Sequence, residues 1–378
     1  MRYFIIAGEA SGDLHASNLM RELKNTDHEA DFCFLGGDLM LSQEGKLIKH
    51  YKDMAFMGFI PVIMNAGKIR QNMKDCKSAI LEYKPDVVIM IDYPSFNLRI
   101  ARFVKKNTQI PVFYYISPKL WAWKEYRIKD IKKYVDKMYT IFPFETEYFA
   151  GHNFQVEYVG NPSVDSVLLR ENQDETFETF CTTNQLENKP IIAILAGSRQ
   201  QEIKTCLPKM VKAAGHFPEY QIVIGGAPGI EPSFYQKFMP DNNCRIVFGQ
   251  TYHLLQQATA AIVNSGTATL ETALFKVPEV VVYYVILGPL SLFLKKIFIK
   301  VKYISLVNLI AGKEIVKELI AHHFTEKNVA AELNKILNNP EYRSDMTEGY
   351  LEVLEKLGEP GTAKRAATKI YAELLSRR

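Results

Sequence analysis

Residues 84–97 read KPDVVIMIDYPSFN, and this stretch decides the fold class. Val87–Ile91 is an unbroken apolar run of strand length, Asp92 stands directly after it, and Pro94 opens the segment that follows. An apolar run without alternation is typical of a strand buried on both faces of a parallel sheet, and proline suits the first turn of a helix. The stretch therefore predicts a buried parallel strand that carries a carboxylate at its carboxyl end and runs into a helix.

The same alternation of short apolar runs and helical patterns occurs on both sides of this stretch. In the first half, further strands are expected at residues 3–7, 32–35 and 112–116. After a polar stretch at residues 171–190 the pattern begins again, with strands expected at residues 191–195, 221–224, 260–263 and 279–285. Strands that alternate with helices indicate parallel sheets. We therefore predict an α/β protein with two doubly wound, Rossmann-like domains.

The polar stretch and the last helical segment suggest where the domains begin and end. We predict an N-terminal domain at residues 1–168, a C-terminal domain at 169–345, and terminal helices at 346–378. Open α/β sheets bind ligands at the carboxyl ends of their strands. Two such domains facing a cleft would suit a reaction between two substrates.

Composition and charge exclude several classes of protein. Of the 378 residues, 47% are hydrophobic and 23% charged, which is typical of a globular protein and argues against disorder. The formal net charge of +4 is too small to indicate a nucleic-acid partner. The longest uncharged run, residues 280–294, is interrupted by a Gly-Pro pair and is shorter than a membrane span needs. We expect no transmembrane segment and no nucleic-acid binding.

The cysteines and the first residues of the chain indicate the cellular compartment of the protein. The five cysteines are an odd number and form no CxxC pair, so they indicate neither a disulfide framework nor a zinc site. The first residues, MRYFIIAGEASGD, contain only one short apolar run before two carboxylates, unlike a secretory signal. We therefore expect a cytoplasmic protein without a bound metal or cofactor.

Two strand-end turns in the first half carry polar residues. The turn at residues 8–13 joins the first strand to a helix, and its candidate acceptor-binding residues are Glu9, Ser11 and Asp13. The alternative is a tight turn in which Ser11 or Asp13 caps the helix. Asp92 is our candidate general base, because partial burial raises the pKa of a carboxyl group. Its alternative role is a cap of the following helix.

Two turns in the second half suit a diphosphate. One contains Gly197, Ser198 and Arg199, which offer backbone N–H groups and a guanidinium. The other opens a helix with small hydroxylic residues, and its candidate donor-binding residues are Ser265, Gly266, Thr267 and Glu271. We expect Glu271 to accept hydrogen bonds from ribose hydroxyls. The alternative readings are an ordinary turn with a surface arginine and a capped helix with a surface glutamate.

Two apolar regions indicate contact with lipid. Residues 54–64 are rich in methionine and phenylalanine, and residues 289–303 form a basic amphipathic pattern that suits a membrane interface. The candidate lipid-contacting residues are Met54, Phe56, Met57, Phe59, Ile60, Phe293, Lys295, Lys296 and Phe298. Ordinary core helices with solvated lysines are the alternative.

Eight blocks together resemble the lipid-A-disaccharide synthase family. They are AGEASGD (7–13), KPDVVIMIDYPSFN (84–97), YYISPKLWAWKEYR (114–127), FPFE (142–145), VGNP (159–162), LAGSR (195–199), NSGTATLE (264–271) and SLVNLIAGKEIVKELI (305–320). They span nearly the whole chain, and the blocks containing WAW and NLIAG are specific to the family. The resemblance implies the GT-B fold, with C-terminal helices that cross back onto the N-terminal domain.

The resemblance also implies an activity. The family moves 2,3-diacylglucosamine from UDP to 2,3-diacylglucosamine 1-phosphate with inversion, releasing UDP and giving a β-1,6-linked disaccharide 1-phosphate for lipid A. It implies that Asp92 is the base, that Arg199 contacts the UDP phosphates and that Asn308 belongs to the donor site. It further implies peripheral contact with the cytoplasmic face of the inner membrane and a homodimer formed by exchange of C-terminal segments.

Three other readings remain open from the sequence. A UDP-sugar epimerase of the same architecture would need no lipid surface and no acceptor. A non-enzymatic ligand-binding protein would need no carboxylate at the site. A GT-B transferase acting on another lipid acceptor would share the remaining features. Glu9 and Asp13 are alternatives to Asp92 as the base.

Overall fold

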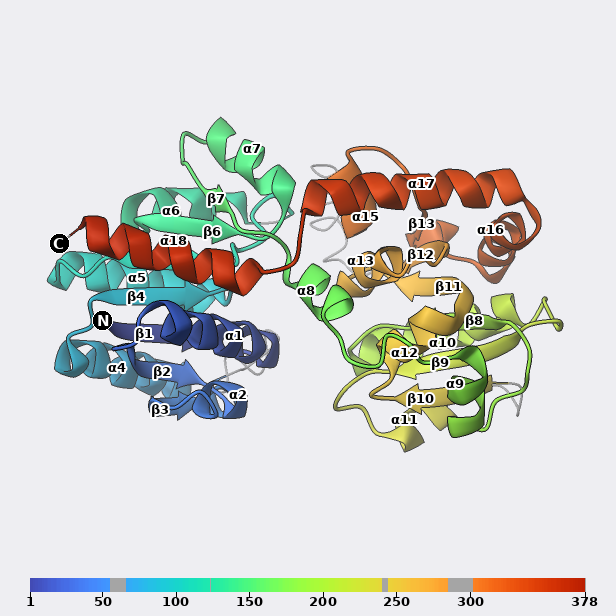
Figure 1. Cartoon of the computed structure of the whole chain (residues 1–378), viewed down its shortest axis with the longest axis horizontal. Coiled ribbons are helices and arrows are strands. Elements are labelled where there is room, and N and C mark those ends of the chain that lie inside the picture. Colours follow the sequence, from blue (N-terminus) through green and yellow to red (C-terminus); the bar gives the residue numbers. More distant parts are fainter. Residues whose placement is uncertain (55–65, 123, 240–243, 285–301, 378) are drawn as a thin grey trace. The chain divides into compact units, whose positions relative to one another are not determined.

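The computed structural model describes residues 1–54, 66–122, 124–239, 244–284 and 302–377 (Figure 1). The chain forms two compact units. One consists of Met1–Pro162 together with Glu359–Arg378, and the other of Ser163–Gly358. The chain therefore leaves the first unit once, builds the second and returns to the first for its last residues.

The first unit contains a seven-stranded sheet in the order β3-β2-β1-β4-β5-β6-β7, and all of its neighbouring strands are parallel. The strands are β1 (Arg2–Ala7), β2 (Asp31–Gly36), β3 (Lys46–His50), β4 (Val87–Ile91), β5 (Val112–Tyr115), β6 (Lys137–Thr140) and β7 (Glu157–Tyr158). Its helices are α1 (Ala10–Thr26), α2 (Asp38–Leu41), α4 (Ala66–Tyr83), α5 (Pro94–Asn107), α6 (Ile128–Tyr134), α7 (Pro143–Gly151) and α18 (Thr362–Ser376), with short 3-10 turns η1 (Tyr51–Asp53) and η2 (Glu125–Arg127).

The second unit contains a six-stranded parallel sheet in the order β10-β9-β8-β11-β12-β13. The strands are β8 (Ile191–Leu195), β9 (Gln221–Gly226), β10 (Cys244–Phe248), β11 (Ala258–Asn264), β12 (Glu279–Tyr283) and β13 (Lys317–Ile320). The helices are α8 (Pro162–Leu168), α9 (Phe177–Thr183), α10 (Gln200–Ala214), α11 (Pro232–Gln236), α12 (Thr251–Gln257), α13 (Thr267–Leu274), α15 (Leu306–Ala311), α16 (Glu326–Asn338) and α17 (Pro340–Leu357), with the 3-10 turn η3 (Ala321–His323). The prediction of two parallel α/β domains is confirmed.

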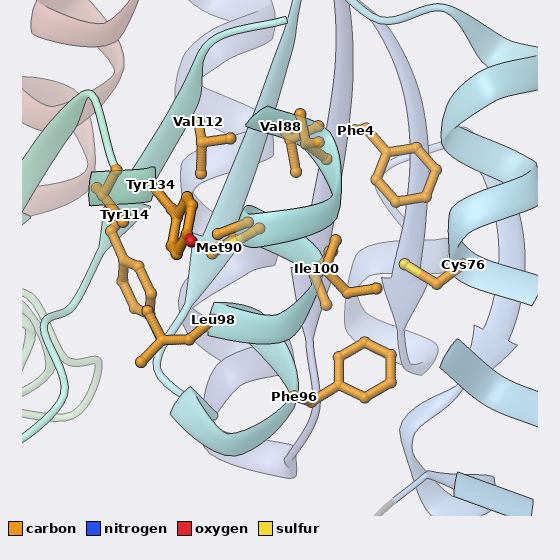
Figure 2. Packing of buried hydrophobic residues seen from close by; sticks show 14 of the residues in the cluster. Phe4, Cys76, Val88, Met90, Phe96, Leu98, Ile100, Val112, Tyr114 and Tyr134 are labelled. Carbon is orange, nitrogen blue, oxygen red and sulfur yellow. The ribbon is translucent and has the colours of Figure 1, made fainter. Parts of the chain in front are cut away.

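The core of the first unit lies between its sheet and the flanking helices. Every residue of β4 is buried, as its unbroken apolar sequence predicts. Val88 and Met90 pack in one cluster with Phe4 of β1, Ile100 of α5 and Cys76 of α4 (Figure 2). Burying each large apolar side chain contributes about 1.5–3 kcal/mol, so this layer holds β4 and its carboxyl end in place.

The unit boundaries differ from the predicted ones at residues 168 and 345. The chain crosses between the units at Pro162 and again at Gly358, and α17 belongs to the second unit, where it packs on α15 and α16. Gly358 follows α17 in the left-handed region with φ 71° and ends that helix. The helical pattern of residues 346–378 shows that these helices pack without showing against what, so the sequence did not reveal that α17 and α18 belong to different units.

The last helix, α18, is held in the first unit by specific contacts. It packs against α1. The Arg365 side chain donates from Nε to the Val159 carbonyl at 2.9 Å, and Lys369 forms an ion pair with Glu157 at 2.7 Å. Gly160 has φ 97°, and a Cβ there would collide with the Arg365 guanidinium. These contacts explain why the second residue of the VGNP block is a glycine, which leaves room for the Arg365 side chain of the returning helix.

Glu279 is a buried carboxyl group without a partner. It is the first residue of β12, it is fully buried, and neither of its carboxyl oxygens has a hydrogen-bond partner in the described part of the chain. Burial raises the pKa of Glu279 well above its usual range. Because the folded protein holds this proton more tightly than the unfolded chain, stability should fall as pH rises above the ordinary glutamate pKa.

We expect Glu279→Gln to remove that pH dependence. Each pH unit between the unfolded and folded pKa values costs the wild type about 1.4 kcal/mol, so the variant should gain at least about 1 kcal/mol over wild type between pH 5.5 and pH 8.5. Urea unfolding at the two pH values measures this. Glu219→Gln, at an exposed glutamate of the same unit, is the control. An equal difference between Glu279→Gln and wild type at both pH values would contradict the expectation.

Candidate active site

The carboxyl end of β4 has an unusual backbone. Asp92 and Tyr93 follow the strand with φ 39° and 45°, both in the left-handed region. Such conformations cost non-glycine residues of order 1–3 kcal/mol each and persist where the surroundings enforce them. Tyr93 occupies the N-cap of α5 and Pro94 its first turn. The peptide at Asp92 therefore turns sharply out of the sheet.

The surroundings of the Asp92 carboxyl group raise its pKa. Burial raises the pKa of Asp92, while the positive charges of Lys119 and Arg127 lower it in part. Lys119 is exposed, and Arg127 is buried and donates to the Ser95 hydroxyl at 2.8 Å. A general base works best when its pKa lies near the working pH, and the net upward direction moves Asp92 toward that range.

The turn at residues 8–13 contains one structural residue. Asp13 is 3% exposed and accepts hydrogen bonds from the backbone N–H groups of Gly37 (2.7 Å), Leu39 (3.1 Å) and Met40 (3.2 Å). These bonds fix the entry to α2, so the prediction that Asp13 contacts the acceptor is wrong, as is its alternative of capping α1.

The other two residues of that turn lie near the end of the strand. Glu9 occupies the N-cap of α1, and Ser11 is exposed in the first turn. The Glu9 charge and, more strongly, burial raise the pKa of Tyr93, which places Glu9 close to the residue after Asp92. Glu9 and Ser11 remain candidates for contact with an acceptor.

The segment after β5 is anchored by Glu145, which the sequence analysis missed. Glu145 is fully buried on α7 and accepts hydrogen bonds from the Ser117 hydroxyl and from Trp121 Nε1 at 3.3 Å. Its other oxygen accepts from the backbone N–H groups of Ile141 (3.3 Å) and Phe142 (3.0 Å). Burial raises the pKa of Glu145 to about 7, against the effect of these bonds.

These contacts of Glu145 hold the segment that carries Lys119 and Arg127 toward Asp92. The sequence contained one indication, because a glutamate three residues after a helix N-cap is typical of a capping box. That pattern alone does not show that the same carboxylate also binds Ser117 and Trp121.

The turn after β8 is occupied by a carboxylate of its own helix. Gly197 has φ 111°, and a Cβ there would collide with the Glu202 side chain. The backbone N–H groups of Ser198 and Arg199 donate to Glu202 Oε2 at 3.0 and 3.3 Å. The prediction that these two amides are open to a diphosphate is therefore wrong for this structure. The Arg199 side chain is 70% exposed and pairs with Glu202 at 3.3 Å, so its guanidinium is accessible to an anion.

The turn after β11 leads into α13. Ser265 donates from its hydroxyl to the Ile304 carbonyl at 3.1 Å, Gly266 precedes the helix, and Thr267 is its first residue. Glu271 lies one turn further on and accepts from the Tyr252 hydroxyl at 3.2 Å. Burial raises the pKa of Glu271. The predicted residues at this turn thus lie together at the carboxyl end of β11.

Asn308 has no hydrogen-bonding capacity left for a ligand. It is fully buried, its amide donates to the Val316 carbonyl (2.8 Å) and to Glu318 (2.9 Å), and its oxygen accepts from the backbone N–H groups of Ile315 (2.7 Å) and Val316 (3.0 Å). The prediction that Asn308 binds the donor directly is therefore wrong for this structure.

The role of Asn308 is to fix the segment next to Ser265. Glu318, its partner, also accepts from the backbone N–H groups of Ile304 (3.1 Å and 3.0 Å) and Ser305 (2.9 Å). Since Ser265 donates to the Ile304 carbonyl, Asn308 and Glu318 hold that segment in place beside the turn that opens α13.

Most of the predicted lipid-contacting residues lie outside the described residues. These are Phe56, Met57, Phe59, Ile60, Phe293, Lys295, Lys296 and Phe298. Met54 is described, but it is 1% exposed and packs in the core cluster of the first unit, so its prediction as a lipid contact is wrong for this structure. No helix in the described ranges is both long and apolar enough to cross a membrane.

The fold is shared with an epimerase and a glycosyltransferase of known structure. A UDP-GlcNAc 2-epimerase from Neisseria meningitidis, solved with bound UDP-GlcNAc, superposes with a TM-score of 0.69 at 14% identity, covering 100% of both chains. A calicheamicin glycosyltransferase superposes with a TM-score of 0.57 at 13% identity, covering 100% of this chain and 98% of the other. At these identities the similarity defines the class of fold, the two-domain GT-B type.

Sequence similarity identifies the family within that class. The family model described as lipid-A-disaccharide synthetase matches residues 3–370. The lipid-A-disaccharide synthase of Syntrophus aciditrophicus is 38% identical over 370 residues, covering 96% of this chain and 95% of the relative. That of Myxococcus xanthus is 34% identical over 380 residues, covering 99% and 97%. The chain belongs to the lipid-A-disaccharide synthase family.

Proposed function

We propose that this protein transfers 2,3-diacylglucosamine from UDP to the 6-hydroxyl of 2,3-diacylglucosamine 1-phosphate, forming the β-1,6-linked lipid A disaccharide 1-phosphate and UDP. The observation that carries the proposal is the family match over residues 3–370. The environment of Asp92 supports it, because a partly buried carboxylate with a raised pKa suits removal of a hydroxyl proton.

On the acceptor side, Asp92 takes the proton from the 6-hydroxyl as that oxygen attacks the anomeric carbon of the donor. The attack displaces the UDP oxygen from the opposite face, which inverts the configuration. Lys119 and Arg127 keep positive charge near Asp92 and stabilise its ionised form before the proton arrives. Glu9 and Ser11 at the start of α1 would contact the acceptor sugar.

On the donor side, the leaving diphosphate gains negative charge as the glycosidic bond breaks. The Arg199 guanidinium, which is exposed, would bind it with two parallel hydrogen bonds. Ser265, Gly266 and Thr267 at the start of α13 offer a further polar contact, since helix N-termini favour anions. Glu271, positioned by Tyr252, would accept from the ribose hydroxyls.

The test is a reaction with both lipid substrates. The purified protein is incubated with UDP-2,3-diacylglucosamine and 2,3-diacylglucosamine 1-phosphate in detergent with EDTA, and UDP and disaccharide are followed by mass spectrometry. We expect disaccharide and UDP in equal amounts. Loss of the UDP-sugar without acceptor, with appearance of its epimer, would instead support an epimerase. Neither product from folded protein would refute the proposal.

The acyl chains of the two substrates lead us to expect that the protein works at a membrane. Both carry acyl chains, so we propose that the protein works at the cytoplasmic face of the inner membrane as a peripheral protein. Co-sedimentation with vesicles containing anionic lipid at low salt tests this. A protein that stays in the supernatant would contradict it. The homodimer formed by exchange of C-terminal segments stays a prediction, and sedimentation velocity would test it.

A further inference from the structure

We propose that Tyr114 and Asn97 are positioning residues for the transfer reaction, because they hold the Asp92 peptide in the conformation that aims its carboxylate. The inference rests on the proposed role of Asp92 as base. It concerns two residues that would touch neither substrate.

Both residues donate to one atom, the backbone carbonyl oxygen of Asp92. The Tyr114 hydroxyl donates to it in a short hydrogen bond, and Asn97 Nδ2 donates to it at 2.7 Å. Asn97 Nδ2 also donates to the Ile91 carbonyl at 3.2 Å. The two side chains come from separate elements, β5 and α5, and both are fully buried. The Tyr114 ring packs in the same core cluster as Leu98 (Figure 2).

The Asp92 backbone needs such support. Asp92 and Tyr93 are consecutive residues in the left-handed region, a conformation that non-glycine residues keep only where their surroundings enforce it. The orientation of the Asp92 carbonyl is fixed by its two buried hydrogen-bond donors, the Tyr114 hydroxyl and Asn97 Nδ2. Since the carbonyl and the Cβ branch from the same Cα, fixing one constrains the other.

The neighbouring Tyr93 is fixed from the other side. Its hydroxyl donates to the Met54 carbonyl at 3.1 Å, and a Cβ on Gly8 would collide with its ring. Asp92 and Tyr93 are therefore held in their left-handed conformation at two points, the Asp92 carbonyl and the Tyr93 side chain. Loss of the hydrogen bonds to the Asp92 carbonyl would leave the Asp92 peptide free to rotate toward an unstrained conformation, which would move the carboxylate.

Tyr114→Phe is the variant that removes one donor and leaves the packing ring. A displacement of about 1 Å in a catalytic group costs on the order of 10²-fold in rate, so we expect kcat to fall about 10- to 100-fold with unchanged UDP affinity. Tyr139→Phe is the matched control, because Tyr139 lies buried on the adjacent strand β6 and its hydroxyl has no partner among the described residues. It should leave kcat within about twofold of wild type.

The pH profile separates positioning from a general loss of stability. Burial is the main cause that raises the pKa of Asp92, opposed by Lys119 and Arg127. A displaced carboxylate is better hydrated, so its pKa should fall and the acid limb of kcat should move to lower pH in Tyr114→Phe. Tyr139→Phe should keep the wild-type limb. Asn97→Ala removes the second donor and should shift the limb in the same direction.

A readout independent of activity completes the test. Carbon NMR of protein labelled at the aspartate carboxyls, with the Asp92 signal assigned from Asp92→Asn, follows the titration of Asp92 directly. The midpoint should be lower in Tyr114→Phe than in wild type and Tyr139→Phe. Equal midpoints and equal kcat in the two tyrosine variants, with Asp92→Asn inactive, would overturn the inference and leave the proposed function standing. Absence of disaccharide from wild type would refute the function, and the titration would still decide the positioning.

Discussion

Asp92→Asn should lower kcat by about 10³-fold and leave the affinity for UDP unchanged. Asparagine keeps the size of the side chain and the polar contacts of its surroundings, but it cannot accept a proton. Asp92 stands at the end of β4, where burial raises its pKa and Lys119 and Arg127 counter that rise. UDP affinity should not change, because the contacts proposed for UDP are made by Arg199, Glu271 and the start of α13 and none is made by Asp92.

The pH dependence of the wild-type rate should reflect the ionisation of Asp92. The rate should rise as Asp92 ionises, so its acid limb should lie above the ordinary aspartate pKa. Steady-state rates of disaccharide formation between pH 4 and pH 9, with calorimetry for UDP, measure both expectations. Glu9→Gln is the comparison variant, since Glu9 is the remaining alternative base. Full activity in Asp92→Asn together with loss in Glu9→Gln would move the base to Glu9.

The central strands of the two sheets were predictable from sequence because they are buried on both faces. The strands β3, β6, β7, β10 and β13 were not predicted, and β3, β7, β10 and β13 are only partly buried. Val87–Ile91 and Ile191–Leu195 are unbroken apolar runs, and both form fully buried central strands. The turns that follow them could be found as strand ends without any structure. The assignment of α17 to the second unit could not, because an amphipathic pattern shows that a helix packs without showing against what.

The roles of individual residues in the candidate site were harder to predict from sequence than their positions at strand ends. Asp13 and Asn308 are polar residues in two of the family-like blocks, and both are engaged with groups of other segments of the protein. The partners of Asp13 lie 24 to 27 residues further along the chain, so no local pattern reveals them. Glu145 was missed in part for the same reason, because Ser117 and Trp121 lie 28 and 24 residues before it. The contacts of Glu202 with Ser198 and Arg199 are local, and its capping-box spacing could have indicated them.

Arg199 is the second residue whose loss should have a large effect. Its guanidinium is the exposed cation of the turn after β8 and pairs only weakly with Glu202, at 3.3 Å. If it binds the leaving diphosphate, it stabilises charge that grows in the transition state, and removing such a group costs about 10²- to 10³-fold in rate. Arg199→Met should therefore lower kcat/KM for the UDP-sugar by that factor.

Arg199→Lys should give an intermediate loss, because lysine keeps the charge but lacks the planar fork that binds a phosphate with two hydrogen bonds. The control is Arg245→Met, at an exposed arginine on β10, which should keep wild-type kcat/KM. Steady-state kinetics with varied UDP-sugar, and calorimetry with UDP, measure the series. Equal activity of Arg199→Met and Arg245→Met would show that the diphosphate is held elsewhere, and the start of α13 would then be the place to look. A graded loss from wild type through lysine to methionine would instead show that Arg199 acts on the diphosphate through both its charge and its geometry.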